Sequence, residues 1–226
     1  MRLAWICCLC VDTVIPHTQE TLEWQSILMN RFFRDVEPNA VERYSAFSET
    51  KHYCDGWMGL FCVKGVVTTI NYLHQKSVGN FCLDALPPTV QSLTINNCAQ
   101  KYAICTRHWP RHIQYVYLRK NRLYGGVNLR TLPPRMVQID LSSNNLRGPI
   151  DLRELPSTIQ SMQLQGIQHT QNVIYYDNLP SGFQYIVLRS ETVIPLERIP
   201  KIRAIDPANA VFNKEVFQGI PPKYVD

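Results

Sequence analysis

The sequence lacks the short motifs that mark common enzyme sites. It contains no Gly-x-Ser-x-Gly nucleophile elbow, no Gly-x-x-x-x-Gly-Lys phosphate loop and no His-Glu-x-x-His zinc motif. His108 and His112 lie at helical spacing, but they flank a Trp-Pro pair where a turn is expected, which disfavours a metal or general-base role. We therefore expect a non-enzymatic protein with no catalytic residue, metal or cofactor.

Other absences narrow the class of protein further. No apolar run reaches the roughly 20 residues that a membrane-spanning helix needs, so no transmembrane anchor is expected. No Cys-x-x-Cys pair follows the first 18 residues, which disfavours a zinc site. There is also no Asn-x-Ser/Thr sequon, which a glycosylated surface protein would usually carry. The 15 prolines and 10 glycines are too few and too regularly placed for a disordered tract.

The sequence does contain an internal repeat with a period of about 23 residues. The first proline of each unit falls at Pro87, Pro110, Pro133, Pro156, Pro180, Pro200 and Pro221. A fixed period in the twenties is typical of a solenoid, in which each unit covers the apolar face of its neighbour.

Two apolar positions recur in each unit with one residue between them, as in a β-strand. The first of this pair is Leu93, Val116, Ile139, Met162, Ile186 or Ile205, and the second is Ile95, Leu118, Leu141, Leu164 or Leu188. In the last unit the second position holds Pro207 in place of an isoleucine or leucine, so the pattern is lost there. A polar position further along holds Asn121 and Asn144, which we expect to hydrogen-bond buried backbone groups where the chain leaves the strand.

Residues 136–146 fit L-x-x-L-x-L-x-x-N-x-L, so the chain resembles the leucine-rich repeat family. Residues 144–150 resemble the turn of plant-type repeats, and the recurring Leu-Pro phrase is similar to trypanosomatid surface-antigen-type repeats. Residues 54–62 resemble the plant-type N-terminal cap C-x-W-x-G-x-x-C, although Gly56 lengthens the first gap. The resemblance implies an α/β solenoid of about six to seven coils, with parallel β-strands on a concave face and a helical cap.

The chain divides accordingly into three parts. Residues 1–18 begin with Arg2 and a short apolar stretch, which favours a signal peptide; an uncleaved segment packed on the cap or on a partner is the alternative. Residues 19–66 are expected to form the cap, with helices over 21–34 and 39–47 separated by Pro38, and with Trp57 in its core. Residues 67–226 form the solenoid, whose first strand is expected to begin at about Gly65 and whose last coils are degenerate.

Four cysteines are candidates for disulfides. The resemblance to the cap implies a bond between Cys54 and Cys62. Cys82 and Cys105 each lie five residues before a coil proline, so they occupy equivalent positions in adjacent coils. Paired strands lie about 4.7–4.9 Å apart, which is within the range that a disulfide spans, so we expect a second bond here. Reduced thiols throughout, as in an intracellular compartment, are the alternative.

Positive charge is concentrated in the middle of the chain. The net charge is +5, but the span from 101 to 147 carries nine basic residues and a single acid. They are Lys101, Arg107, Arg111, Arg119, Lys120, Arg122, Arg130, Arg135 and Arg147, against Asp140. Because most of these side chains fall on turns, the span is read first as a solvated basic face without a ligand, and an acidic glycan or another polyanion as a partner is the alternative.

The exposed strand positions of the concave face are the candidate binding residues. Tyrosine and arginine are enriched at binding hot spots. The candidates are Tyr115, Tyr117, Arg119, Asp140, Gln163, Gln165, Tyr185 and Arg189. Each alone is also compatible with an ordinary exposed strand residue, and Arg119 and Asp140 are also compatible with a mutual ion pair.

These features predict a secreted or cell-surface recognition module that binds a protein or an acidic glycan through its concave face. A nucleic-acid partner is not expected. The alternative is a structural subunit of a larger intracellular assembly. After Ile205 the pattern weakens, so the last strand is expected either to be covered by the apolar residues of 211–217 or to offer an edge for self-association.

Overall fold

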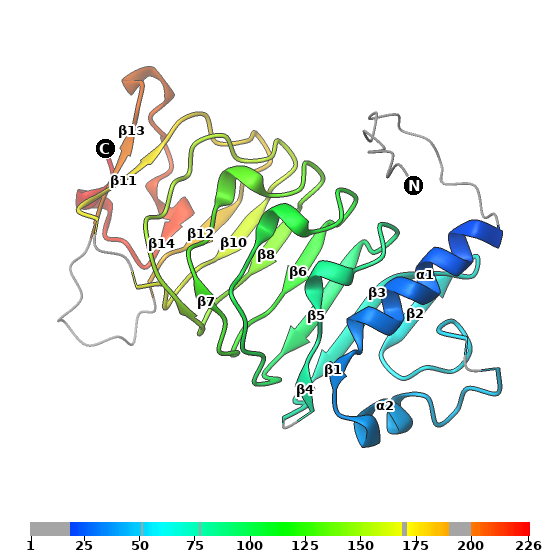
Figure 1. Ribbon diagram of the computed structural model, residues 1–226. Helices are drawn as coiled ribbons and strands as arrows, with labels where there is room; N and C mark the ends of the chain where they lie inside the picture. Colours follow the sequence, from blue (N-terminus) through cyan, green and yellow to red (C-terminus); the bar gives the residue numbers. More distant parts are fainter. Residues whose placement is uncertain (1–18, 51, 77, 169–170, 190–199) are drawn as a thin grey trace, which may run out of the picture.

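The chain is a β-solenoid of about five turns with a parallel sheet on one side and a helical N-terminal end (Figure 1). The computed structural model describes residues 19–50, 52–76, 78–168, 171–189 and 200–226. The expected solenoid class is confirmed. The turns are fewer than the prolines suggested, because Pro200 precedes a strand outside the main sheet and no strand follows Pro221. The expected signal peptide lies outside the described residues.

Two helices lie at the N-terminal end, α1 (Gln19–Phe32) and α2 (Pro38–Tyr44). Both were predicted, but Pro38 begins α2, where it was expected only to end the preceding helix. Proline suits this position because the first turn of a helix leaves its N–H groups unpaired. Between the helices, β1 (Asp35–Val36) pairs antiparallel with β4 (Gly79–Asn80) and ties the cap to the first coil.

The main sheet has eight strands in the order β14-β12-β10-β8-β6-β5-β3-β2. They are β2 (Leu60–Val63), β3 (Val66–Leu73), β5 (Ser92–Asn96), β6 (Tyr115–Tyr117), β8 (Gln138–Asp140), β10 (Ser161–Gln163), β12 (Tyr185–Val187) and β14 (Phe217–Gln218). All neighbours pair parallel except β2, which joins β3 antiparallel. The register places Leu93, Val116, Ile139, Met162 and Ile186 opposite one another, and all five are buried. The predicted core positions are therefore confirmed across these five strands.

The return side of the coils contains short 3-10 helices and a small ladder. The helices η1 (Leu83–Ala85), η2 (Thr106–His108) and η3 (Leu129–Thr131) occupy equivalent places in successive coils. The parallel pair β7 (Tyr124–Gly125) and β9 (Asn145–Leu146) forms the ladder. A coil of about 23 residues leaves no room for an α-helix here, so helical structure on this side is limited to single turns.

Asn121 and Asn144 hydrogen-bond the backbone inside the coils, as predicted. The Asn121 side-chain oxygen accepts from the backbone N–H groups of Cys98 (3.0 Å) and Gln100 (3.1 Å), and its amide donates to the carbonyl of Ile95 (2.7 Å). Asn144 repeats the pattern one coil later, accepting from the N–H of Leu123 at 3.1 Å. Each amide side chain thus pairs backbone groups that would otherwise be buried without partners.

The C-terminal coil is built differently from the prediction. Ile205 was expected to point into the core, but it is 51% exposed, because β13 (Lys201–Ala204) pairs with β11 (Val173–Tyr176) on the return side. Phe217 of β14 instead lies opposite Ile186 and packs on Tyr176, with ring centroids 5.4 Å apart. The remaining turns are η4 (Pro207–Asn209), η5 (Lys214–Val216) and η6 (Pro222–Tyr224). Of the two phenylalanines expected in an apolar lid, Phe217 is buried and Phe212 is fully exposed.

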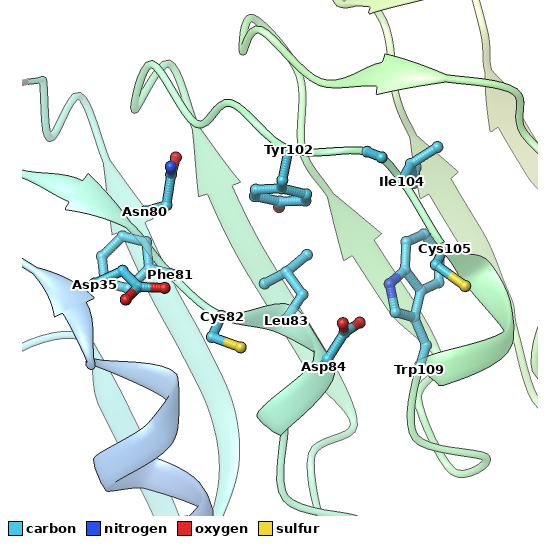
Figure 2. Close-up of a pocket in the computed structure, with 11 residues that line it drawn as sticks. Asp35, Asn80, Phe81, Cys82, Leu83, Asp84, Tyr102, Ile104, Cys105 and Trp109 are labelled. Carbon is cyan, nitrogen blue, oxygen red and sulfur yellow. The ribbon is translucent and has the colours of Figure 1, made fainter.

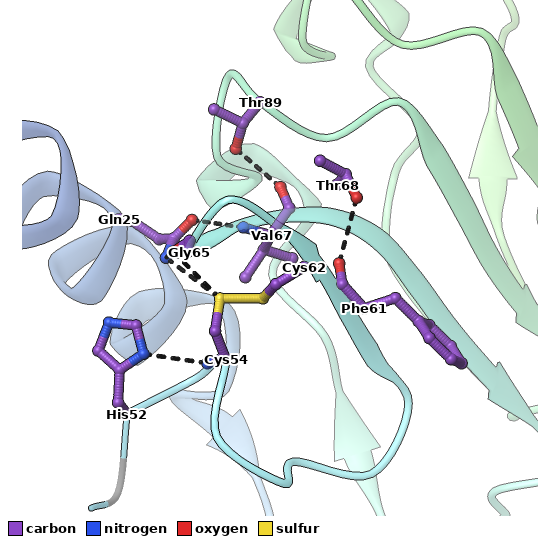
Figure 3. The surroundings of a disulfide bond; sticks show 9 residues. All are labelled: Gln25, His52, Cys54, Phe61, Cys62, Gly65, Val67, Thr68 and Thr89. Carbon is purple, nitrogen blue, oxygen red and sulfur yellow. Dashed lines mark hydrogen bonds between the residues drawn. A yellow bond between two sulfur atoms is a disulfide. The ribbon is translucent and has the colours of Figure 1, made fainter. Parts of the chain in front are cut away.

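A disulfide between Cys54 and Cys62 anchors the cap (Figure 3). Gln25 of α1, only 3% exposed, lies beside it and joins the helix to the sheet. Its side-chain oxygen accepts from the N–H of Val67 at 2.7 Å, and its amide donates to the carbonyl of Gly65 at 3.3 Å. Trp57 is buried against Tyr53, and their ring centroids lie 4.5 Å apart. This confirms the expected place of Trp57 in the cap core.

Within the described part of the chain, no helix has the length and apolar character needed to cross a membrane.

Candidate binding face

The concave face is defined here as the solvent-facing side of the main sheet. Because strand side chains alternate, residues on either side of each buried core position point to it. The register aligns them in two rows across the strands. One row is Phe61, Thr69, Ser92, Tyr115, Gln138, Ser161 and Tyr185, and the other is Asn71, Thr94, Tyr117, Asp140, Gln163, Val187 and Gln218. Uncharged polar and aromatic side chains dominate both rows.

Three tyrosines lie on this face, two near the middle of the sheet and one near its C-terminal end. Tyr115 and Tyr117 of β6 and Tyr185 of β12 are all half-buried. The Tyr117 hydroxyl donates to the Gln138 side-chain oxygen at 2.5 Å, which fixes the ring over β8. Burial raises the pKa of Tyr117, and the nearby phenols of Tyr115 and Tyr185 raise it further. The three predicted tyrosines therefore share one face of the sheet, with β8 and β10 between the β6 pair and Tyr185.

Asp140 was expected to be exposed, and this expectation is wrong. The residue is only 3% exposed, and its carboxylate accepts from both the N–H (2.9 Å) and the hydroxyl (2.5 Å) of Ser142. A short carboxylate at the end of a strand readily turns back onto the backbone two residues later, which removes it from the surface. Among the described residues, Asp140 forms no ion pair with Arg119. Arg119 is exposed on the neighbouring coil.

The remaining candidates lie on β10 or just after β10 and β12. Gln163 is half-buried on β10. Gln165 and Arg189 occupy equivalent positions in adjacent coils, just after β10 and β12. The side-chain oxygen of Gln165 and the Nε of Arg189 are buried, and neither has a hydrogen-bond partner among the described residues. One acceptor and one donor therefore remain unpaired at this edge of the concave face.

The sequence reasoning missed the part of the face that the cap contributes. Strand β2 extends the sheet, and Phe61, which is 58% exposed, lies opposite Thr69 in the first row. Val63 and Leu73 are also exposed at this end. An alternating pattern over Leu60, Phe61, Cys62 and Val63 could have indicated this strand. Four residues inside a cap motif are, however, too few to distinguish a strand from a loop.

The predicted bond between Cys82 and Cys105 is not formed, and both thiols are free, as is that of Cys98. The two cysteines lie on the return side at the edges of a cavity of about 170 Å³, with Leu83 and Asp84 between them (Figure 2). Here adjacent coils are joined through the Asn80 side chain, which accepts from the N–H of Lys101 at 2.8 Å. Strand spacing therefore does not apply at these two residues, because, among the described residues, no β-bridge joins Cys82 to Cys105.

The same cavity contains an unpaired phenol. The Tyr102 hydroxyl is buried and has no partner among the described residues, and burial raises the pKa of Tyr102 strongly. Nearby, Nδ1 of His108 lies 3.0 Å from the carboxylate of Asp84. In the described ranges no three His, Cys, Asp or Glu side chains converge as they would around a metal ion.

Comparison with known proteins gives similarities of fold. No family model matches the chain, and no curated protein matches it. The ectodomain of the receptor kinase SOBIR1 from Arabidopsis thaliana, a leucine-rich repeat domain, is 16% identical with a TM-score of 0.49, over 76% of this chain and 99% of that one. Pollen Receptor Kinase 3 is 17% identical with a TM-score of 0.45, over 67% and 79% of the two chains.

A third similar structure is the leucine-rich repeat ectodomain of the Arabidopsis receptor kinase HAESA, solved in complex with an IDA peptide hormone that is lengthened at its N-terminus. It is 14% identical with a TM-score of 0.45, over 74% of this chain and 34% of that one. These similarities concern the arrangement of the chain alone, and no ligand is carried over from them.

Proposed function

We propose that this protein is an extracellular, non-enzymatic recognition module that binds a protein or peptide partner across its concave face. The tyrosine group formed by Tyr115, Tyr117 and Tyr185 is the observation that carries this proposal. Tyrosine supplies a large, rigid contact area at little entropic cost, and it is enriched among hot-spot residues.

The surroundings of the tyrosines support a partner that contributes many hydrogen bonds. The side-chain amides of Gln138 and Gln163 and the hydroxyl of Thr94 are half-buried on this face. Asp140, the only acid in either row, is buried. Gln165 and Arg189 are both half-buried at the edge of this face and add further polar side chains to it. An extended peptide segment, which presents regularly spaced carbonyl and N–H groups, matches such a surface.

A selection experiment tests the proposal without a known ligand. A displayed library of random peptides is panned against the folded protein, and the best peptide is mapped by hydrogen exchange. We expect new protection in β6, β8, β10 and β12, because the peptide lies across these strands. Protection confined to the return side, or no peptide better than background, would count against the concave face as the binding surface.

We also propose an extracellular location, supported by the Cys54–Cys62 disulfide. Intact-mass spectrometry of the protein from its own cells, before and after reduction and alkylation, tests it. We expect one disulfide, three free thiols beyond the first 18 residues, and loss of an N-terminal segment. An intact Met1 with Cys54 and Cys62 reduced would instead favour the alternative, a structural subunit of an intracellular assembly.

A further inference from the structure

A second surface, separate from the concave face, lies over the return-side ladder of β7 and β9. Leu123 and Leu146 are buried, so the residues on either side of them point outward. The register places Tyr124 beside Asn145, and isolated bridges join Ala103 to Tyr124 and Arg147 to Gln168. We define the ladder surface as the outward residues Lys101, Arg122, Tyr124, Asn145, Arg147 and Gln168, all of which are exposed.

The ladder surface is positively charged without compensation. The sequence contains no aspartate or glutamate from 85 to 139, and the next acid, Asp140, is buried on the concave side. Some basic side chains elsewhere on the described surface are paired, as in the ion pairs Arg130–Glu154 and Arg153–Asp151. Lys101, Arg122 and Arg147 have no ion pair with any described acid. Three unpaired cations on adjacent coils therefore create a local field that attracts a chain with repeated negative charges.

The centre of the ladder surface is flat and aromatic. Tyr124 is 48% exposed, and the positions beside it in the ladder and the turns are Gly125, Gly126 and Gly148. Gly126 is exposed, and the next atom that a side chain there would meet is the carbonyl oxygen of Arg147, at 3.5 Å. No side chain rises from these glycines, so the Tyr124 ring is open to a flat, ring-shaped group, with the amide of Asn145 beside it.

We propose that the ladder surface binds an acidic polysaccharide made of uronic acid units. Arginine pairs with planar carboxylates through two parallel hydrogen bonds, so Arg122 and Arg147 suit the carboxylate of each sugar. The exposed Tyr124 ring offers an apolar face for the C–H side of a sugar ring. The amides of Asn145 and Gln168 can bond to its hydroxyl groups.

An acidic protein segment fits this surface less well. One mode of peptide binding, strand addition, pairs an extended peptide with free backbone groups at a sheet edge. In the ladder these N–H groups are already used: Tyr124 donates to Tyr102 at 3.1 Å, Asn145 to Leu123 at 2.8 Å, and Arg147 to Gly125 at 2.9 Å. A ligand must therefore bind through side chains, which sugars with carboxylates and hydroxyls can do along their whole length.

Calorimetric titration with alginate oligomers tests the proposal, with neutral dextran and polyglutamate of matched length as comparisons. We expect alginate to bind, dextran not to bind, and polyglutamate to bind at least about tenfold more weakly because it has no ring to stack on Tyr124. Failure of alginate to bind, or equal binding of polyglutamate, would overturn the proposal, the latter in favour of an acidic protein partner.

Variants locate the site. Arg122→Gln is expected to weaken alginate binding about tenfold, whereas Arg111→Gln, which removes the same charge from the other edge of the coil, leaves it unchanged. Tyr124→Ala is expected to weaken binding several-fold, and Tyr175→Ala, which removes a tyrosine of similar exposure (47%), is not. Tyr117→Ala on the concave face should leave alginate binding intact, which separates this proposal from the concave-face function. Equal effects of Arg111→Gln and Arg122→Gln would show general charge attraction and overturn the site.

Discussion

At the scale of single residues, buried amide side chains hold the coils together. We predict that Asn144→Ala lowers the free energy of unfolding by about 2–4 kcal/mol, because it leaves several buried backbone groups without partners. Among them are the N–H of Leu123 and the carbonyls of Leu118 and Leu141, each bonded within 3.1 Å. Chemical denaturation monitored by circular dichroism measures the change.

The next residue provides a matched control for this prediction. Asn145 is exposed, so Asn145→Ala should change the stability by less than about 0.5 kcal/mol. Equal losses for the two variants would contradict the role given to the buried amide.

The two asparagines were predictable from the sequence, whereas Asp140 and Gln25 were not. The repeat places Asn121 and Asn144 in one recurring position, and an amide at that position has an obvious backbone partner. Asp140 also follows the repeat, but the repeat gives only the side of the sheet. It cannot show that the carboxylate turns back to Ser142. Gln25 bonds to Val67, which is 42 residues away, and no local pattern announces such a contact.

At the scale of elements, the disulfide and α1 stabilise the open end of the sheet together. We predict that Cys54→Ser lowers the free energy of unfolding by about 2–3 kcal/mol, as expected for opening a short disulfide loop. Cys105→Ser removes an exposed free thiol and should have almost no effect. Thermal unfolding of both variants under non-reducing conditions makes the comparison. A loss of stability with Cys105→Ser similar to that with Cys54→Ser would contradict the assigned pairing.

Sequence spacing predicted strand register better than it predicted the return side. On the sheet, coils are joined by direct backbone hydrogen bonds, so equivalent residues such as Val116 and Ile139 lie side by side. On the return side, Asn80 joins the coils through its side chain and a cavity separates Cys82 from Cys105. Equivalent positions therefore imply contact only where the backbones pair.

At the scale of the whole molecule, the sheet ends at β14, a strand of only two residues. No other described strand pairs with its outer edge, so self-association through this end stays a prediction. We expect sedimentation equilibrium to show a concentration-dependent dimer that Gln218→Lys, a charge at the edge, abolishes. A monomer at every concentration, or a dimer unchanged by Gln218→Lys, would contradict it.

The tyrosine group of the concave face is the surface that we propose binds the partner. The most direct test of this proposal is the affinity of a selected peptide for the double variant Tyr117→Ala/Tyr185→Ala, compared with Tyr175→Ala, which lies outside this face. We predict that the double variant binds at least about thirtyfold more weakly, the change expected for losing about 2 kcal/mol at a hot spot, while Tyr175→Ala binds normally. Equal affinity of both variants for the peptide would contradict the claim.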